Sequence, residues 1–286
     1  MFEELDLFGR EQLKKLLAII ILTDGNIKKS GKYFKAFRLI TSVHSEGQHD
    51  LFRYLCEKLF DKTPKRFETI INGKTFLESD LFCVKAVKEI MKLSPSYKTS
   101  PCNEKVKDYL IKSSPTFSFI FEENNFFKWI VFRIWFDFEG SITPTFRLSK
   151  KVDGGKYVYY QSSFETQFYI ACAHPNLSEE LIRLCGDLGL CAKIKKDKRC
   201  WSGIGGIRIT RKKDIKKIIS HGPMTNVKIS KKSPRFAGIE KKKICSLVKS
   251  IYENDISCSK SFKNRELGEK YRTKNYNKML EILKFL

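Results

Sequence analysis

The sequence predicts an α+β protein made of two αββαββα repeats that are related by a pseudo-twofold axis. Its 286 residues are 42% hydrophobic and 13% aromatic, so the chain can form one large core or two of ordinary size. Segments 16–27 and 132–142 share one pattern: an apolar helix, then a carboxylate, a glycine, a small polar residue and isoleucine. The elements expected after each segment follow in the same order, which indicates a duplicated unit.

The first repeat is predicted to run helix, hairpin, helix, hairpin, helix. Its first helix ends at Asp24, and Asn72-Gly73 is a type I′ turn signal between two β-patterned runs. The elements expected here are helix 11–23, strand 37–44, helix 50–60, strands 66–71 and 74–82, and helix 84–93.

The second repeat is predicted to have the same elements with a longer first hairpin. Residues 150–156 are polar and glycine-containing, as expected at the tip of a hairpin about fifteen residues longer than its counterpart. Asp214 is a plausible cap of the last helix. The elements expected here are helix 126–138, strands 141–149 and 168–174, helix 179–184, strands 192–196 and 204–210, and helix 214–220.

The rest of the chain is divided between a linker and a tail. We place the first repeat at 1–112, the linker at 113–125 and the second repeat at 126–235. Phenylalanines in the linker predict that it packs on the core. Lys-rich helices are appended at 236–286, over 239–252 and 276–286, with a loop over 255–264.

The charge of the chain indicates which classes of partner it binds. A formal net charge of +23 concentrates polyanions, of which nucleic acid is the commonest and an anionic membrane the rival. The longest apolar stretch, 16–22, is too short to span a bilayer, and the acidic N-terminus does not suit a secretory signal. We expect an intracellular protein of the cytoplasm, nucleoid or an organelle that is not secreted and needs no membrane. No CxxC pair occurs among its nine cysteines, which disfavours zinc and disulfides.

The two carboxylate-ended helices suggest a catalytic site. Both are apolar on all sides near their ends, so they are expected to pack on each other and bring Asp24 and Glu139 together. Two adjacent carboxylates repel each other, and a hard cation such as Mg²⁺ relieves the repulsion. An acidic pair in a basic protein is typical of metal-assisted phosphodiester hydrolysis. The alternative is that both residues are polar helix ends before glycine C-caps.

The strands after these helices suggest a surface that binds DNA. Ile142, Pro144, Phe146 and Leu148 alternate with polar residues, so one face meets a core and the other is polar and cationic. A two-stranded ribbon fits the major groove of DNA. The alternative is a solvated sheet face. The residues expected to contact DNA are Asn26, Lys28, Lys32, Arg38, Ser42, Ser141, Thr143, Thr145, Arg147, Lys193, Lys195 and Arg208.

Residues 17–25 and 132–140 resemble the two motifs of single-chain LAGLIDADG homing endonucleases, and the flanking element order covers most of 10–235. The resemblance implies central paired helices and two saddle-like antiparallel sheets that bind DNA. The chain departs from the family pattern at Ile19 and Ile134, where the family often has a small residue, which implies a wider helix crossing. Asp137 is the second departure, and we expect it to point away from Glu139 as a local cap or a partner of a cation.

The resemblance also implies roles for individual residues. Asp24 and Glu139 would bind catalytic Mg²⁺, or Mn²⁺ or Ca²⁺ in its place, with backbone from Gly25 and Gly140. Two lysines would be basic catalytic residues near the scissile phosphates: Lys228 and its weaker counterpart Lys98. Two histidines, His44 and His174, would line a pocket around the attacking water, with Ser45 and Asn176 beside them.

The function expected is site-specific cleavage of double-stranded DNA. The protein would be a monomeric intron-type homing endonuclease that hydrolyses both strands of a long asymmetric target with metal-activated water. The alternative is an intron RNA maturase or a catalytically inactive nucleic-acid-binding protein on the same scaffold, so intron RNA is a second possible partner.

Overall fold

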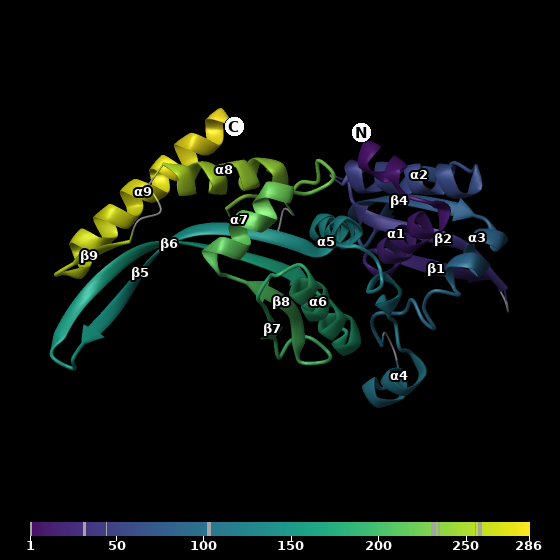
Figure 1. The fold of residues 1–286 in the computed structure, drawn as a ribbon, viewed down its shortest axis with the longest axis horizontal. Coiled ribbons are helices and arrows are strands. Elements are labelled where there is room, and N and C mark those ends of the chain that lie inside the picture. The colour runs from purple at the N-terminus through teal and green to yellow at the C-terminus, as the bar shows by residue number, and fades with distance from the viewer. Residues whose placement is uncertain are drawn as a thin grey trace.

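Two antiparallel sheets lie on either side of a central pair of helices, α1 (Arg10–Leu22) and α5 (Asn125–Glu139), which pack on each other (Figure 1). The computed structural model describes residues 2–286 except 31–32, 44, 102–103, 230–232, 234, 255 and 257–258. Lys32 and His44, two residues expected at the functional site, lie outside the described residues.

The first half of the chain forms a four-stranded sheet in the order β1-β2-β4-β3. Asn72 (φ 49°) and Gly73 (φ 71°) both have positive φ, which confirms the type I′ turn between β3 and β4. A 3₁₀-helix, η1, precedes α1. The elements are η1 (Glu3–Leu7), α1, β1 (Gly25–Ser30), β2 (Tyr33–Ser42), α2 (Glu46–Phe60), β3 (Lys65–Ile71), β4 (Lys74–Phe82) and α3 (Val84–Ile90).

The second half repeats this order as β5-β6-β8-β7, which confirms the two predicted repeats. Its first hairpin is longer, with Gly154 (φ 55°) and Gly155 (φ 73°) at the tip, where the additional residues are expected. The elements are α5, β5 (Gly140–Asp153), β6 (Tyr157–Ala171), α6 (Pro175–Asp187), β7 (Ala192–Lys196), β8 (Ile204–Ile209) and α7 (Lys212–His221).

The core is built around α1 and α5. Every residue from Leu16 to Leu22 is buried, as the apolar pattern predicts. The side chain of Asn124 caps α5 by accepting a hydrogen bond from the backbone N–H of Phe127 at 2.9 Å. Phe117 of the linker is buried against Trp135 of α5, with ring centroids 5.7 Å apart, so the linker packs on the core as expected.

Gly25 and Gly140 allow a strand to leave the end of each central helix at close range. A Cβ atom on Gly25 would lie 2.5 Å from Cα of Ile21, and one on Gly140 would lie 2.6 Å from Cα of Phe136. Gly140 has φ −85°, so lack of space rather than an unusual backbone angle requires the glycine. The two repeats therefore share this requirement.

The C-terminal segment differs from the prediction. It forms α8 (Lys241–Glu253), a short strand β9 (Lys260–Phe262) within the expected loop, and α9 (Arg265–Phe285), which begins well before the expected start at 276. β9 pairs with β6, and α8 and α9 lie along the β5–β6 ribbon (Figure 1). A Cβ on Gly268 of α9 would lie 2.7 Å from Leu148, so α9 covers the apolar face of the ribbon.

Two short elements add to the expected ones, and one expectation is wrong. A short helix, α4 (Val106–Lys112), lies at the end of the expected first repeat, and a 3₁₀-turn, η2 (Ser118–Ile120), lies in the linker. Asp214 does not cap α7, because Arg211 holds the N-cap position. Asp214 lies in the first turn and accepts hydrogen bonds from Arg211 and from the backbone N–H of Cys191.

Within the described part of the chain, no helix is long and apolar enough to cross a membrane.

Candidate functional site

Asp24 and Glu139 lie together at the ends of the central helices. Both side chains are partly buried and both line a cavity of about 660 Å³. Burial raises the pKa of each carboxyl group above its usual range, and the charge of Asp24 raises the pKa of Glu139 further. The helix pairing therefore brings these two carboxylates close enough to interact electrostatically.

Lys241, the first residue of α8, is a buried cation beside this pair. It is only 5% exposed, and its Nζ donates hydrogen bonds to the carbonyl groups of Phe136 (2.7 Å) and Asp137 (2.8 Å). These carbonyls belong to the last turn of α5, where the helix dipole favours a cation. Burial lowers the pKa of Lys241 to about 8, although the charges of Asp137, Glu139 and Asp24 raise it.

Asp137 is fully buried and lines the same cavity. Its Oδ2 accepts a hydrogen bond from the backbone N–H of Thr225 at 3.0 Å, and its backbone carbonyl accepts one from Gln48 of α2 at 3.0 Å. Burial raises the pKa of Asp137 to about 7, and the nearby Lys241 charge opposes this rise. Asp137 thus faces a cation, as one of its expected roles requires, and the last turn of α5 is held by both halves of the chain.

Lys228 and Ser42 complete this cavity. Lys228 is exposed and lines it, and its backbone forms a bridge with Glu240 just before Lys241. Ser42 and Ser45 also line it, and their hydroxyl groups lie 3.1 Å apart. The cavity is therefore lined by hydroxyl groups and ammonium groups together with the carboxylates of Asp24, Asp137 and Glu139.

A second cavity of about 430 Å³ also reaches Glu139. His174 lines it, is 3% exposed and packs against Trp201, with ring centroids 5.9 Å apart. Burial lowers the pKa of His174 below its usual value. Lys98 does not line the cavity, because its Nζ pairs with Glu104 at 2.9 Å. Asn176 does not line the cavity either, and its side chain donates a hydrogen bond to the backbone carbonyl of Pro115 at 2.7 Å.

The donor set suits a hard cation that is shared with a phosphate substrate. Among the described residues, no group of three or more His, Cys, Asp or Glu side chains could hold a metal ion by itself. Asp24 and Glu139 provide two carboxylates, and Gly25 and Gly140 provide adjacent carbonyl groups. Mg²⁺ commonly binds through one or two carboxylates together with phosphate oxygens and water. The residues present fit a divalent cation in this role.

The second sheet presents one polar face. Ser141, Tyr169, Arg208 and Lys193 form one row across four strands, each opposite the next. The other residues of this face that we expect to contact DNA are Thr143, Thr145, Arg147 and Lys195. A groove of about 490 Å³ on this face is lined by Thr143, Thr145, Arg147 and Arg208. The alternating pattern therefore gathers these residues on one side.

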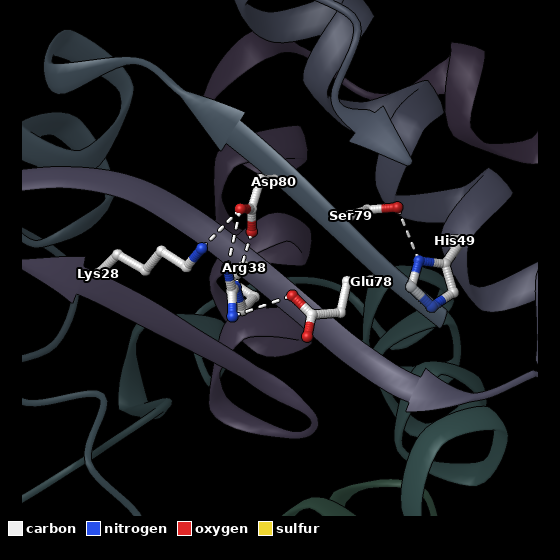
Figure 2. Close-up of polar contacts among 6 residues, drawn as sticks. All are labelled: Lys28, Arg38, His49, Glu78, Ser79 and Asp80. Atoms are coloured by element: carbon white, nitrogen blue, oxygen red, sulfur yellow. Dashed lines mark hydrogen bonds and ion pairs between the residues drawn. The ribbon is translucent and has the colours of Figure 1, made fainter. Parts of the chain in front are cut away.

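On the first sheet, Lys28 and Arg38 are held by two acidic residues of β4 (Figure 2). Lys28 Nζ lies 2.6 Å from Asp80 Oδ2, and Arg38 Nε lies 2.9 Å from Asp80 Oδ1. Arg38 Nη1 also lies 2.9 Å from Glu78 Oε2. Glu78 and Asp80 are 1% and 3% exposed, so the two cations neutralise two buried carboxylates. Asn26, which lies opposite Arg38, is exposed.

Four residues that shape the site are absent from the sequence-based prediction. The alternation Leu77-Glu78-Ser79-Asp80-Leu81 places both acids on one face of β4, and this signal could have revealed them. Gln48 and Lys241 carry no comparable signal, since one is an ordinary helix residue and the other is one of 55 Lys and Arg residues.

The fold defines a class: two α+β repeats around paired helices, with an acidic residue at the end of α5 and another just after α1, the fold of the LAGLIDADG homing endonucleases. The chain is similar to I-AabMI bound to uncleaved DNA (13% identity, TM-score 0.51, covering 95% of this chain and 98% of that one). It is also similar to I-LtrWI bound to target DNA (12%, 0.50, 97% and 98%) and to I-SmaMI bound to uncleaveable DNA (13%, 0.50, 96% and 96%). No family model and no curated protein matches the sequence.

Proposed function

We propose that the protein is a site-specific endonuclease that cleaves double-stranded DNA, of the intron-homing type. It acts as a monomer with a divalent cation, Mg²⁺ in the cell. Such a substrate implies an intracellular protein of the cytoplasm, nucleoid or an organelle. I-AabMI and I-LtrWI, which have the same fold, are bound to DNA in their structures.

The observation that carries the proposal is the acidic pair between two polar sheet faces. A surface that only binds DNA gains nothing from two carboxylates at its centre, because they repel phosphates. Asp24 and Glu139 nevertheless lie there, partly buried; burial raises the pKa of both, and the charge of Asp24 raises the pKa of Glu139 further. Carboxylates in this arrangement are useful when they hold a cation that contacts the scissile phosphate.

Each part of the site has a distinct task in this proposal. Asp24 and Glu139 hold the cation, which supplies a water of lowered pKa and neutralises charge on the phosphate when bound. Lys228 contacts a phosphate at the mouth of the cavity. Lys241 fixes the last turn of α5 and so positions the Glu139 carboxylate.

DNA is bound along the two sheets. On the second sheet the contacts are Ser141, Thr143, Thr145, Arg147, Lys193, Lys195 and Arg208. On the first sheet they include Asn26, which follows Asp24 closely in the chain, and Ser42, which lines the same cavity as Asp24. Because the β5–β6 ribbon is longer than β1–β2, the two half-sites differ in length and the target is asymmetric. Most of the binding energy comes from the surplus of 23 positive charges, so affinity falls steeply with salt.

Acid variants test the proposal. Wild-type protein with Mg²⁺ is incubated with a duplex library, and targets are recovered by binding and by cutting. We expect Asp24→Asn and Glu139→Gln to lower the cleavage rate by about a thousandfold or more and to change DNA affinity by less than about threefold. Glu11→Gln, which alters an exposed acid (75% exposed) at the start of α1, is the matched control and should cleave normally.

Two results would contradict the proposal. The first is that no duplex is cut in Mg²⁺ although DNA is bound tightly, which favours a catalytically inactive binding protein. The second is that RNA with the same half-sites competes as well as DNA and the acid variants keep full function, which favours a splicing cofactor.

A further inference from the structure

The free edge of β5 carries a small cavity that is separate from the acidic pair. Among the described strands, β5 is the outermost of the second sheet and pairs only with β6. A cavity of about 260 Å³ is lined by Thr145 and Phe146, adjacent residues whose side chains point to opposite faces of the sheet. Because it reaches both faces, the cavity lies around the unpaired edge. Thr145 also lines the groove on the polar face, so the two openings meet there.

Two arginines line this cavity, which we call the edge cavity. Arg235 belongs to the segment between α7 and α8, and Arg272 lies on α9. Arg235 Nη1 donates a hydrogen bond to Thr145 Oγ1 at 2.9 Å, and its guanidinium group lies 5.6 Å from the ring centroid of Tyr276. A hydroxyl group and an aromatic ring therefore hold this exposed guanidinium in one orientation.

The segment that carries Arg235 is anchored to the core. The backbone N–H of Ile229 donates to the carbonyl of Ile239 at 2.8 Å, and that of Gly238 donates to the carbonyl of Ile229 at 2.9 Å. Phe236, the residue after Arg235, is 1% exposed and lines the cavity of the acidic pair. Arg235 is thus fixed in place before a ligand binds, which lowers the entropy cost of binding.

The charges around the edge cavity leave it positive. None of its described lining residues is Asp or Glu. Glu269 of α9 pairs with Arg272 at 2.7 Å, and Glu165 of β6 pairs with Arg147 at 3.0 Å. Each of these acids is matched by one arginine. Arg235 forms no ion pair with a described residue, so its charge is not neutralised by the protein.

A phosphate of the DNA backbone suits this arrangement. A guanidinium group donates five N–H bonds in a planar fork that matches phosphate oxygens, and Arg235 directs one of its nitrogens at Thr145. A sheet that fills the major groove is bordered by the phosphate backbones, so a cation just beyond an edge strand meets phosphates and not base edges. Thr145 lies about 17 Å along β5 from Gly140, which places this phosphate well away from the cut.

We propose that Arg235, with Arg272 beside it, binds a backbone phosphate of DNA at the free edge of β5. The inference rests on the DNA binding in the proposed function and does not depend on cleavage. The C-terminal extension is then part of the DNA interface of the second half-site, beside the sheet. Only Gly268 and Met279 are buried among the 21 residues of α9, so packing in the core gives little reason for this helix.

The salt dependence of binding provides the first test. Affinity for a duplex selected by binding is measured in EDTA at several salt concentrations, so that no strand is cut. Arg235→Met should weaken binding about tenfold and lower the slope of log affinity against log salt by about one. Arg235→Lys should keep the slope and recover only part of the affinity, because lysine keeps the charge without the planar fork.

A control variant on the same helix removes the same charge elsewhere. Lys274 is exposed and lies two residues from both Arg272 and Tyr276, so it points to the opposite side of α9. Lys274→Met should change affinity by less than about twofold, because solvent and salt screen its charge from the duplex.

Single methylphosphonates, which remove the charge of one phosphate, locate the contact. They are placed at each position of the second half-site on either strand, and affinity is again measured in EDTA. We expect one position on one strand where the substitution costs the wild-type protein about fivefold or more and Arg235→Met less than about twofold. Arg272→Met should reduce the same loss and leave the losses at other positions unchanged.

Thermal unfolding separates a contact with DNA from a role in folding. Because Arg235 is exposed, Arg235→Met should melt within about 2 °C of the wild-type protein. A much lower melting temperature together with losses spread evenly over all methylphosphonate positions would show a structural role and overturn the inference.

The remaining outcomes separate the two proposals. An unchanged salt slope and unchanged methylphosphonate losses in Arg235→Met overturn the inference and leave the proposed endonuclease intact, as does an equal fall of the slope in Lys274→Met. Failure to cut any duplex in Mg²⁺ overturns the proposed cleavage, and binding in EDTA then still decides whether Arg235 contacts a phosphate. Absence of DNA binding overturns both.

Discussion

We predict that His49→Gln changes how the stability of the protein depends on pH. His49 is fully buried on α2, with Nε2 2.8 Å from Thr41 Oγ1 and Nδ1 2.7 Å from Ser79 Oγ, the latter shown in Figure 2. Both of these contacts suit a neutral imidazole ring. Burial, and after it the charge of Arg66, lowers the pKa of His49 from 6.5 to about 4, against a smaller opposing effect of Asp50.

The sign and size follow from proton linkage. Below pH 6.5 the unfolded chain binds a proton at this residue that the folded chain excludes until about pH 4. The stabilisation is therefore complete above pH 6.5 and is lost as the pH falls from 6.5 to 4. A shift of this size corresponds to about 3 kcal/mol in total, of which about 2 kcal/mol is lost by pH 5.

Urea denaturation at several pH values measures this loss. The free energy of unfolding of wild-type protein is compared with that of His49→Gln, which keeps polar atoms near Thr41 and Ser79 and does not titrate. The difference between the two proteins should change by about 2 kcal/mol from pH 7.5 to pH 5. Other titrating groups cancel in this comparison. A parallel pH dependence of the two proteins would refute the reasoning.

Three further predictions concern the site. Gly140→Ala should lower the free energy of unfolding by about 2 to 4 kcal/mol, because the new methyl group meets the backbone of Phe136. The control Gly186→Ala lies in α6 with open space around it and should be neutral or stabilising. Thermal unfolding of the two variants compares them. Arg38→Met should destabilise the protein by about 3 kcal/mol, since it leaves Glu78 and Asp80 buried with fewer cations, and urea titration would contradict this if stability were unchanged. Lys241→Met should cost a similar amount and Lys242→Met less than about 0.5 kcal/mol, as measured by calorimetry; equal losses would show that the buried hydrogen bonds contribute nothing specific.

The repeated fold could be predicted from the sequence because local patterns and tertiary structure agree there. The apolar run from Leu16 to Leu22, the alternation along β5 and the turn signal at Asn72-Gly73 each specify one element. β9 could not be predicted, because a strand of three residues exists only through its pairing with β6. The start of α9 was missed for a related reason: only Gly268 and Met279 of this helix are buried, so it has little apolar periodicity.

The candidate site was predictable only in part. Asp24 and Glu139 stand out because the same motif occurs twice, and the twofold relation then brings the motifs together. The partners of Arg38 depend on strand register, which a sequence pattern alone does not fix. The position of Lys241 depends on how the C-terminal segment folds back on α5, and nothing near Lys241 in the sequence indicates that contact.

The asymmetry of the site has a physical origin in the single chain. In a dimer of identical subunits, every substitution beside the twofold axis appears twice. A buried lysine and aspartate near the acidic pair would then have to be accommodated on both sides, and their desolvation cost would be doubled. In this chain the helical extension α8 and α9 follows the second repeat, so Lys241 of α8 reaches the last turn of α5. Asp137 lies in that turn, whereas α1 has Leu22 at the equivalent position. The same extension that braces the long ribbon therefore also places a buried cation beside Asp137, at the end of α5 and not of α1.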